Sequence, residues 1–189
     1  AIENAMNIKE HEVPSFFEED VLFIKEGGAV SEASFGIEIL ANEIISWAKE
    51  NKIENLKVFL PSGTGTTALY LQKYLPFEVL TCACVGNEEY LEKQFNNLEK
   101  QNHPTIIKNQ KKYYFGKLYK EFYEIHNELL RQTNIEFDFL YDCLGWISYE
   151  KYRKDTQNSD FEYLYIHQGG IQGNISMYER YKNKYDKSL

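Results

Sequence analysis

The chain has 189 residues, of which 43% are hydrophobic and 15% aromatic, and its formal net charge is −8. This apolar content is too high for an intrinsically disordered chain, and the length suits one globular domain with its own core. The acidic balance argues against nucleic acid as a partner, because phosphate backbones are bound by a surplus of lysine and arginine. The longest apolar runs fall far short of the roughly 20 residues of a membrane-spanning helix, so no membrane partner is predicted.

Short apolar runs typical of strands alternate along the chain with longer runs of helical periodicity. In chain order, strands are predicted over Val21–Ile24, Leu56–Leu60, Val79–Val85, Phe137–Tyr141 and Tyr163–His167. Helices are predicted over Ala1–Lys9, Ser34–Asn51, Thr66–Leu75, Glu88–Gln101, Lys117–Arg131, Cys143–Tyr152 and Ile171–Tyr181. Between them, Gln101–Tyr113 is rich in Lys, Asn and Gln and predicts a long loop or lid. The alternation predicts a three-layer α/β fold, with helices on both faces of a mostly parallel sheet.

The chain contains three cysteines, Cys82, Cys84 and Cys143. On a strand, Cys82 and Cys84 share one face and lie too close in sequence for an easy disulfide. The sequence therefore predicts reduced, mostly buried thiols in a cytoplasmic protein. The four histidines show no ligand spacing around them, so no metal site is predicted.

The strongest local pattern is a small, hydroxyl-rich turn that joins a predicted strand to a predicted helix. Ligands of open parallel sheets bind at the carboxyl ends of the strands, where this turn lies. The N–H groups that begin a helix attract an anion, and glycines let the backbone approach it closely. The turn is not a Walker loop, because Thr66 rather than lysine follows Gly65. We predict a phosphate site rather than a plain capped turn, formed by Ser62, Gly63, Thr64, Gly65, Thr66 and Thr67.

Two further turns follow predicted strands. Tyr141 and Asp142 end one strand, and a polar pair, His167 and Gln168, precedes the Gly169–Gly170 dipeptide after another. A carboxylate and a phenol at a strand end would face the expected ligand crevice. Taken alone, however, Asp142 suits a helix cap and His167 suits a partnered structural histidine.

In this order, these segments resemble the second half of the tryptophan-synthase-β-like (fold type II) pyridoxal-phosphate enzymes. The nearest resemblance is to the 1-aminocyclopropane-1-carboxylate (ACC) deaminase and D-cysteine desulfhydrase family. The segments that carry it are Glu26–Gly28, Ser62–Thr67, Asp138–Asp142 and His167–Gly170. The resemblance covers the chain from about residue 26 to 181 and implies pyridoxal 5'-phosphate as cofactor, a small amino acid as substrate and a homodimer.

The resemblance also implies roles for individual residues. The Ser62–Thr67 turn would hold the cofactor phosphate, with Gln168 as a further cofactor-binding residue. Asp142 would keep the pyridine nitrogen protonated, which makes the ring a better electron sink. Tyr141 would be the catalytic phenol beside the substrate's α-carbon and amino group. An aromatic residue near Gly116, either Tyr114 or Phe115, would occupy the place of a second family tyrosine.

No lysine of this sequence has the context of the family's Schiff-base lysine, which belongs to a segment preceding Ala1. The expectation is therefore the C-terminal portion of a longer enzyme, inactive alone because it lacks that nucleophilic amine. On this interpretation residues 1–25 are a remnant of a preceding small domain or a linker. Residues 26–189 form the α/β domain that binds the cofactor phosphate.

Three alternatives stay open. A D-cysteine desulfhydrase-like lyase fits the same motifs, although the acidic Asp142 favours the deaminase branch. A phosphoribosyltransferase loop resembles the Ser62–Thr67 turn, but it normally follows two adjacent acidic residues, and Leu60–Pro61 stands there instead. A non-catalytic domain that binds a phosphate-bearing ligand is the third possibility, since a fold does not fix a function.

Overall fold

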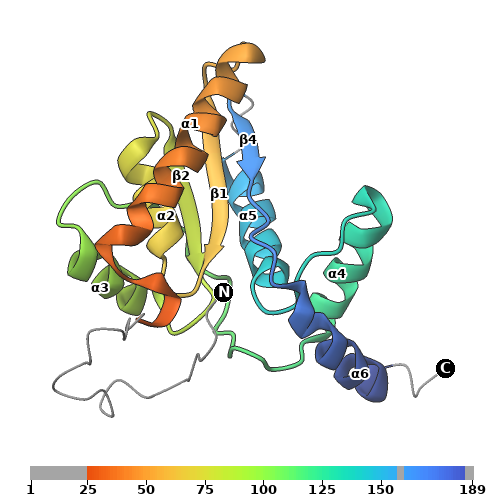
Figure 1. Cartoon of the computed structure of the whole chain (residues 1–189). Coiled ribbons are helices and arrows are strands. Elements are labelled where there is room, and N and C mark those ends of the chain that lie inside the picture. The colour runs from red at the N-terminus through yellow and green to blue at the C-terminus, as the bar shows by residue number, and fades with distance from the viewer. Residues whose placement is uncertain (1–24, 157–159, 186–189) are drawn as a thin grey trace, which may run out of the picture.

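A computed structural model describes residues 25–156 and 160–185. Its centre is a four-stranded, wholly parallel sheet in the order β3-β2-β1-β4 (Figure 1). The strands are β1 (Leu56–Ser62), β2 (Glu78–Ala83), β3 (Thr105–Ile106) and β4 (Glu162–Tyr165). The predicted α/β fold with a parallel sheet is confirmed. Within the described ranges, no helix is both long enough and apolar enough to span a membrane.

Helices cover both faces of the sheet (Figure 1). Their bounds are α1 (Ser34–Glu50), α2 (Thr66–Tyr74), α3 (Glu88–Leu98), α4 (Lys120–Thr133), α5 (Asp142–Thr156) and α6 (Asn174–Tyr185). Alternate strand residues point to opposite faces: Val58 and Leu60 pack with α1 and α2, whereas Phe59 packs with α5. On the α5 side, α4 and α6 extend the core with further buried aromatic residues.

The pairing of β1 is longer on one side than on the other. With β2 it runs from Lys57↔Glu78 to Ser62↔Ala83, whereas with β4 it ends at Phe59↔Tyr165. Beyond that point the side-chain amide of Gln168 donates to the Pro61 carbonyl oxygen at 2.6 Å. The chain after β4 thus leaves the sheet while β1 continues, which opens a space at the carboxyl end of β1.

The predicted strand Phe137–Tyr141 is wrong: the segment is an irregular turn that leads into α5. The carboxylate of Asp138 accepts hydrogen bonds from the N–H groups of Leu140, Tyr141 and Asp142, at 2.7, 2.8 and 3.1 Å. Side-chain acceptors of this kind compete with the backbone ladder. Those N–H groups are consequently unavailable to a neighbouring strand.

The other predicted elements differ from the structure mainly at their ends. The C-terminal helix begins as a 3₁₀ turn, η4 (Ile171–Gly173), before α6. The predicted 101–113 loop contains the short strand β3. The predictions for Ala1–Lys9 and Val21–Ile24 lie outside the described residues. All three cysteines are buried free thiols, as predicted.

Candidate functional site

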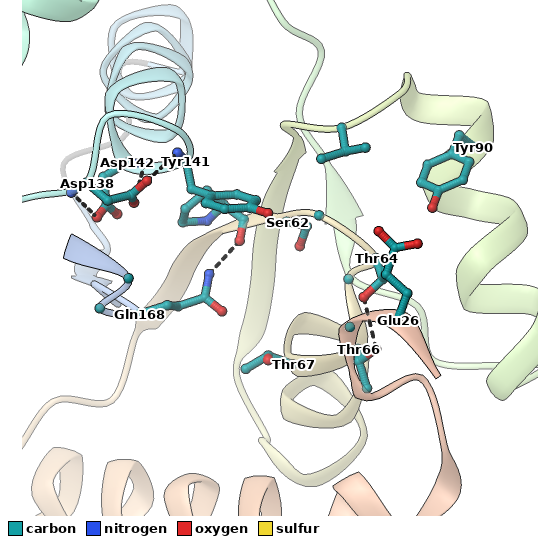
Figure 2. A pocket seen from close by; sticks show the side chains of 17 residues that line it. Glu26, Ser62, Thr64, Thr66, Thr67, Tyr90, Asp138, Tyr141, Asp142 and Gln168 are labelled. Atoms are coloured by element: carbon teal, nitrogen blue, oxygen red, sulfur yellow. Dashed lines mark hydrogen bonds between the residues drawn. The ribbon is translucent and has the colours of Figure 1, made fainter. Parts of the chain in front are cut away.

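A pocket of about 300 Å³ opens at the carboxyl end of β1 (Figure 2). Its lining comes from residues 26–27, 61–67, 141–142 and 168–170, together with Val85, Tyr90 and Asp138. The predicted cofactor-binding and catalytic residues, Ser62–Thr67, Tyr141, Asp142 and Gln168, all line this one pocket, whereas the aromatic candidates Tyr114 and Phe115 do not. The prediction of what these residues bind stays a prediction.

The floor of the pocket is the turn from β1 into α2, which we call the cradle (Ser62–Thr67). Gly65 adopts φ +79°, and a Cβ there would lie 2.5 Å from a ring carbon of Phe95 and 2.6 Å from Leu91 Cδ1. Only glycine combines this left-handed backbone with such close packing. It allows α2 to begin directly at the pocket.

The cradle presents a donor set that suits a phosphate group. The first helical hydrogen bond of α2 runs from Leu69 N to Gly65 O at 2.9 Å. The N–H groups of Thr66, Thr67 and Ala68 precede that bond and belong to the unpaired first turn of the helix. The hydroxyls of Thr64 and Thr66 lie 3.2 Å apart beside them. Such N–H groups and hydroxyls bind an anion without a lysine or arginine.

Ser62 contributes differently from its neighbours. Its hydroxyl shares a hydrogen bond of 2.6 Å with the Thr81 hydroxyl, and both residues are buried. This bond joins β1 to β2 beneath the pocket. Ser62 therefore lines the pocket while its hydroxyl is held by the sheet.

One wall of the pocket is the carboxylate of Asp142, which is 1% exposed. It accepts hydrogen bonds from Tyr165 Oη at 3.0 Å, His167 Nδ1 at 2.5 Å and Asp138 N at 3.2 Å. A carboxylate has about four acceptor positions, so one remains. His167 is a partnered histidine, as its sequence context indicated.

Asp138 lies against Asp142 and fixes the backbone of the next residues. Both carboxylates are buried. Burial, followed by the charge of Asp142, raises the pKa of Asp138 to about 6. The three N–H groups that Asp138 accepts hold Tyr141 at the pocket wall.

Tyr141 lies over the cradle. A Cβ on Gly63 would lie 3.3 Å from its ring and 3.4 Å from its hydroxyl oxygen. Burial raises the pKa of Tyr141, and Cys84, Asp138 and Glu26 add to the effect, so the phenol is protonated at neutral pH. Of the two aromatic candidates near Gly116, Phe115 packs against Tyr141, with ring centroids 5.3 Å apart.

Some residues of the lining were not predicted from the sequence. Glu26 and Gly27 lie at the mouth of the pocket, and Tyr90 on α3 closes one side. The first two belong to a segment that carried the family resemblance, whereas nothing in the sequence marked Tyr90. Among the described lining residues there is neither lysine nor arginine.

The fold is similar to that of an ACC deaminase homologue. That crystal structure superposes with a TM-score of 0.68 at 17% sequence identity, over 82% of this chain and 51% of the homologue. This chain thus spans about half the length of that protein. No protein-family model and no curated protein matches the sequence. At this identity the similarity confirms the predicted fold.

Proposed function

We propose that this chain forms the cofactor-phosphate-binding part of a pyridoxal-phosphate enzyme that deaminates a small amino acid, in the manner of an ACC deaminase. The observation that carries the proposal is the single pocket at the carboxyl end of β1. It combines a neutral anion cradle, a buried carboxylate and a phenol. The similar fold of an ACC deaminase homologue supports it.

Each residue has a distinct task in this proposal. When bound, the cofactor would withdraw electrons from the substrate through its protonated ring. The N–H groups of Thr66 and Thr67 would hold the phosphate, and the remaining acceptor position of Asp142 would take the ring N–H. The phenol of Tyr141, protonated at rest, would donate its proton to the substrate and recover it later.

The nucleophilic amine of such a reaction must come from elsewhere. None of the described lining residues is a lysine. The proposal therefore takes that amine from outside the described lining residues. The homodimer and the cytoplasmic location stay predictions.

Equilibrium dialysis tests the cradle directly, with pyridoxal phosphate and pyridoxal as paired ligands. We expect the protein to retain the phosphate ester far better than the ester-free compound. Thr66→Val removes a hydroxyl donor without changing the shape of the side chain. Hydrogen bonds to charged groups contribute roughly 1.5–3 kcal/mol, so affinity for the ester should fall about 10- to 150-fold.

Thr105→Val serves as the matched control, because Thr105 is exposed on β3, away from the pocket. It should leave the affinity for pyridoxal phosphate unchanged. Equal retention of the two ligands by the unmodified protein would contradict the phosphate role of the cradle. So would an unchanged affinity in Thr66→Val.

A second candidate is a domain that binds a phosphorylated ligand without turnover. The absence of an amine from the described lining residues favours it. Because this chain alone is expected to be inactive, the assay uses the longer protein that the deaminase proposal requires, loaded with the cofactor and incubated with ACC and with D-cysteine. Ammonia release from ACC supports the deaminase, and sulfide release from D-cysteine supports the lyase. Retention of pyridoxal phosphate with neither product supports the binding domain.

A further inference from the structure

A second negative group faces the cradle from the side opposite Asp142. Glu26 belongs to the 3₁₀ turn η2 (Glu26–Gly28) and lines the pocket. Figure 2 shows the Glu26 carboxylate pointing toward Tyr90, on the side of the cradle away from Asp142. Its charge also reaches across the pocket, because it contributes to the raised pKa of Tyr141.

The η2 turn lies directly on the cradle. Gly27 has φ +67°, and a Cβ at this position would lie 2.1 Å from Thr64 Oγ1. Only a glycine lets the η2 backbone approach the Thr64 side chain so closely. The side chain of Glu26 therefore lies at the mouth of the pocket, next to the cradle.

A carboxylate at this place weakens the attraction of the cradle's N–H groups and hydroxyls for an anion. The first turn of α2 attracts negative charge, whereas Glu26 repels it. The repulsion grows in proportion to the charge of the incoming ligand. The described lining residues include no lysine or arginine that would offset this effect.

We propose that Glu26 is a specificity-determining residue that limits the charge of ligands bound by the cradle. It admits a single phosphate ester, particularly one that carries a cationic ring, and discriminates against polyanions such as diphosphates. This proposal rests on the proposed function, since it assumes that the cradle binds phosphate. It adds the class of ligand that the pocket rejects.

Calorimetric titration of the unmodified protein, Glu26→Gln and Glu32→Gln with inorganic phosphate and with pyrophosphate tests the proposal. Glu32→Gln is the matched control, because it removes the same charge from the adjoining 3₁₀ turn, outside the pocket lining. Because Glu26 is exposed and its charge is partly screened by solvent, we expect phosphate affinity to rise roughly two- to fivefold in Glu26→Gln, and pyrophosphate affinity to rise further. Salt should reduce both gains.

Gly27→Ala gives a second test, because its Cβ would lie 2.1 Å from Thr64 Oγ1, so that the η2 turn or the Thr64 side chain must move and the contact that holds Glu26 over the cradle is loosened. It should raise pyrophosphate affinity while Glu26 remains in place. Equal gains in Glu26→Gln and Glu32→Gln, or equal gains for the two anions, would overturn the proposal. If no variant binds either anion, the phosphate role of the cradle itself is wrong, which is a different outcome.

Discussion

Replacing Gly65 with alanine should destabilise the protein for two separable reasons. The first is backbone strain, because φ is +79° and a left-handed conformation costs a non-glycine residue about 1–2 kcal/mol. The second is overpacking, because the new Cβ would lie 2.5 Å from Phe95 and 2.6 Å from Leu91. These two side chains are buried in the cluster between α2, α3 and β2. Overpacking of this kind typically costs about 1–3 kcal/mol.

The free energy of unfolding should therefore fall by about 2–5 kcal/mol in Gly65→Ala. For a chain of this size each kcal/mol lowers Tm by about 2–4 °C, so Tm should fall by about 4–20 °C. Gly116→Ala is the matched control: φ there is +71°, but no atom lies within 4 Å of the new Cβ. It carries the strain alone, about 1–2 kcal/mol.

Urea unfolding followed by circular dichroism measures both variants, and dialysis with pyridoxal phosphate measures their cradles. We expect Gly65→Ala to lose more stability than Gly116→Ala and also to lose the ligand. Equal losses of stability would refute the packing argument. Full retention of the ligand by Gly65→Ala would refute the claim that this glycine sets the start of α2 at the pocket.

Two further predictions concern buried polar groups. In the folded protein, burial and Asp142 raise the pKa of Asp138 from 3.8 to about 6. The protonated Asp138 therefore makes its full contribution to stability below about pH 4. That contribution is lost as pH rises through 6, by about 3 kcal/mol. Urea unfolding between about pH 4 and pH 7 should show this fall in the free energy of unfolding. Asp138→Asn should make the free energy of unfolding less dependent on pH. The same pH dependence in both proteins would contradict the prediction. Ser62→Ala leaves the Thr81 hydroxyl buried without its partner and should lower the free energy of unfolding by about 1–3 kcal/mol. The double variant Ser62→Ala with Thr81→Val should recover most of this loss in urea unfolding. A double variant as unstable as Ser62→Ala would count against the explanation.

The cradle could be predicted from the sequence because the residues that determine its conformation are neighbours in the chain. Glycines, threonines and a helix start are adjacent in the chain, and each favours the same turn. The strands β1 and β2 could also be predicted from the sequence, since buried parallel strands are nearly continuous apolar runs. Their carboxyl ends then indicated where a ligand would bind.

The segment before α5 could not be read in the same way. Phe137–Tyr141 is an apolar and aromatic run like a strand, interrupted only by Asp138, but the Asp138 carboxylate takes up the N–H groups that a ladder would need. A side chain that bonds its own neighbouring backbone competes with strand formation. Only the location of that carboxylate in three dimensions decides the outcome.

Other parts of the site depend on contacts between distant segments. Glu26 reaches the pocket because Gly27 packs on Thr64, and Tyr90 reaches it because α3 packs against α2. Neither contact leaves a periodic pattern in the sequence. The two-residue strand β3 was likewise too short to stand out from its polar surroundings.

The unequal pairing of β1 has a consequence for the order of folding. The Ser62–Thr81 bond closes a separation of 19 residues, whereas the Gln168–Pro61 bond closes one of 107. Loop-closure entropy makes the longer closure costlier by about 1.5 kcal/mol. The β1–β2 half, with its cradle, should therefore assemble first, and the His167–Asp142 wall should arrive in a later and slower kinetic phase.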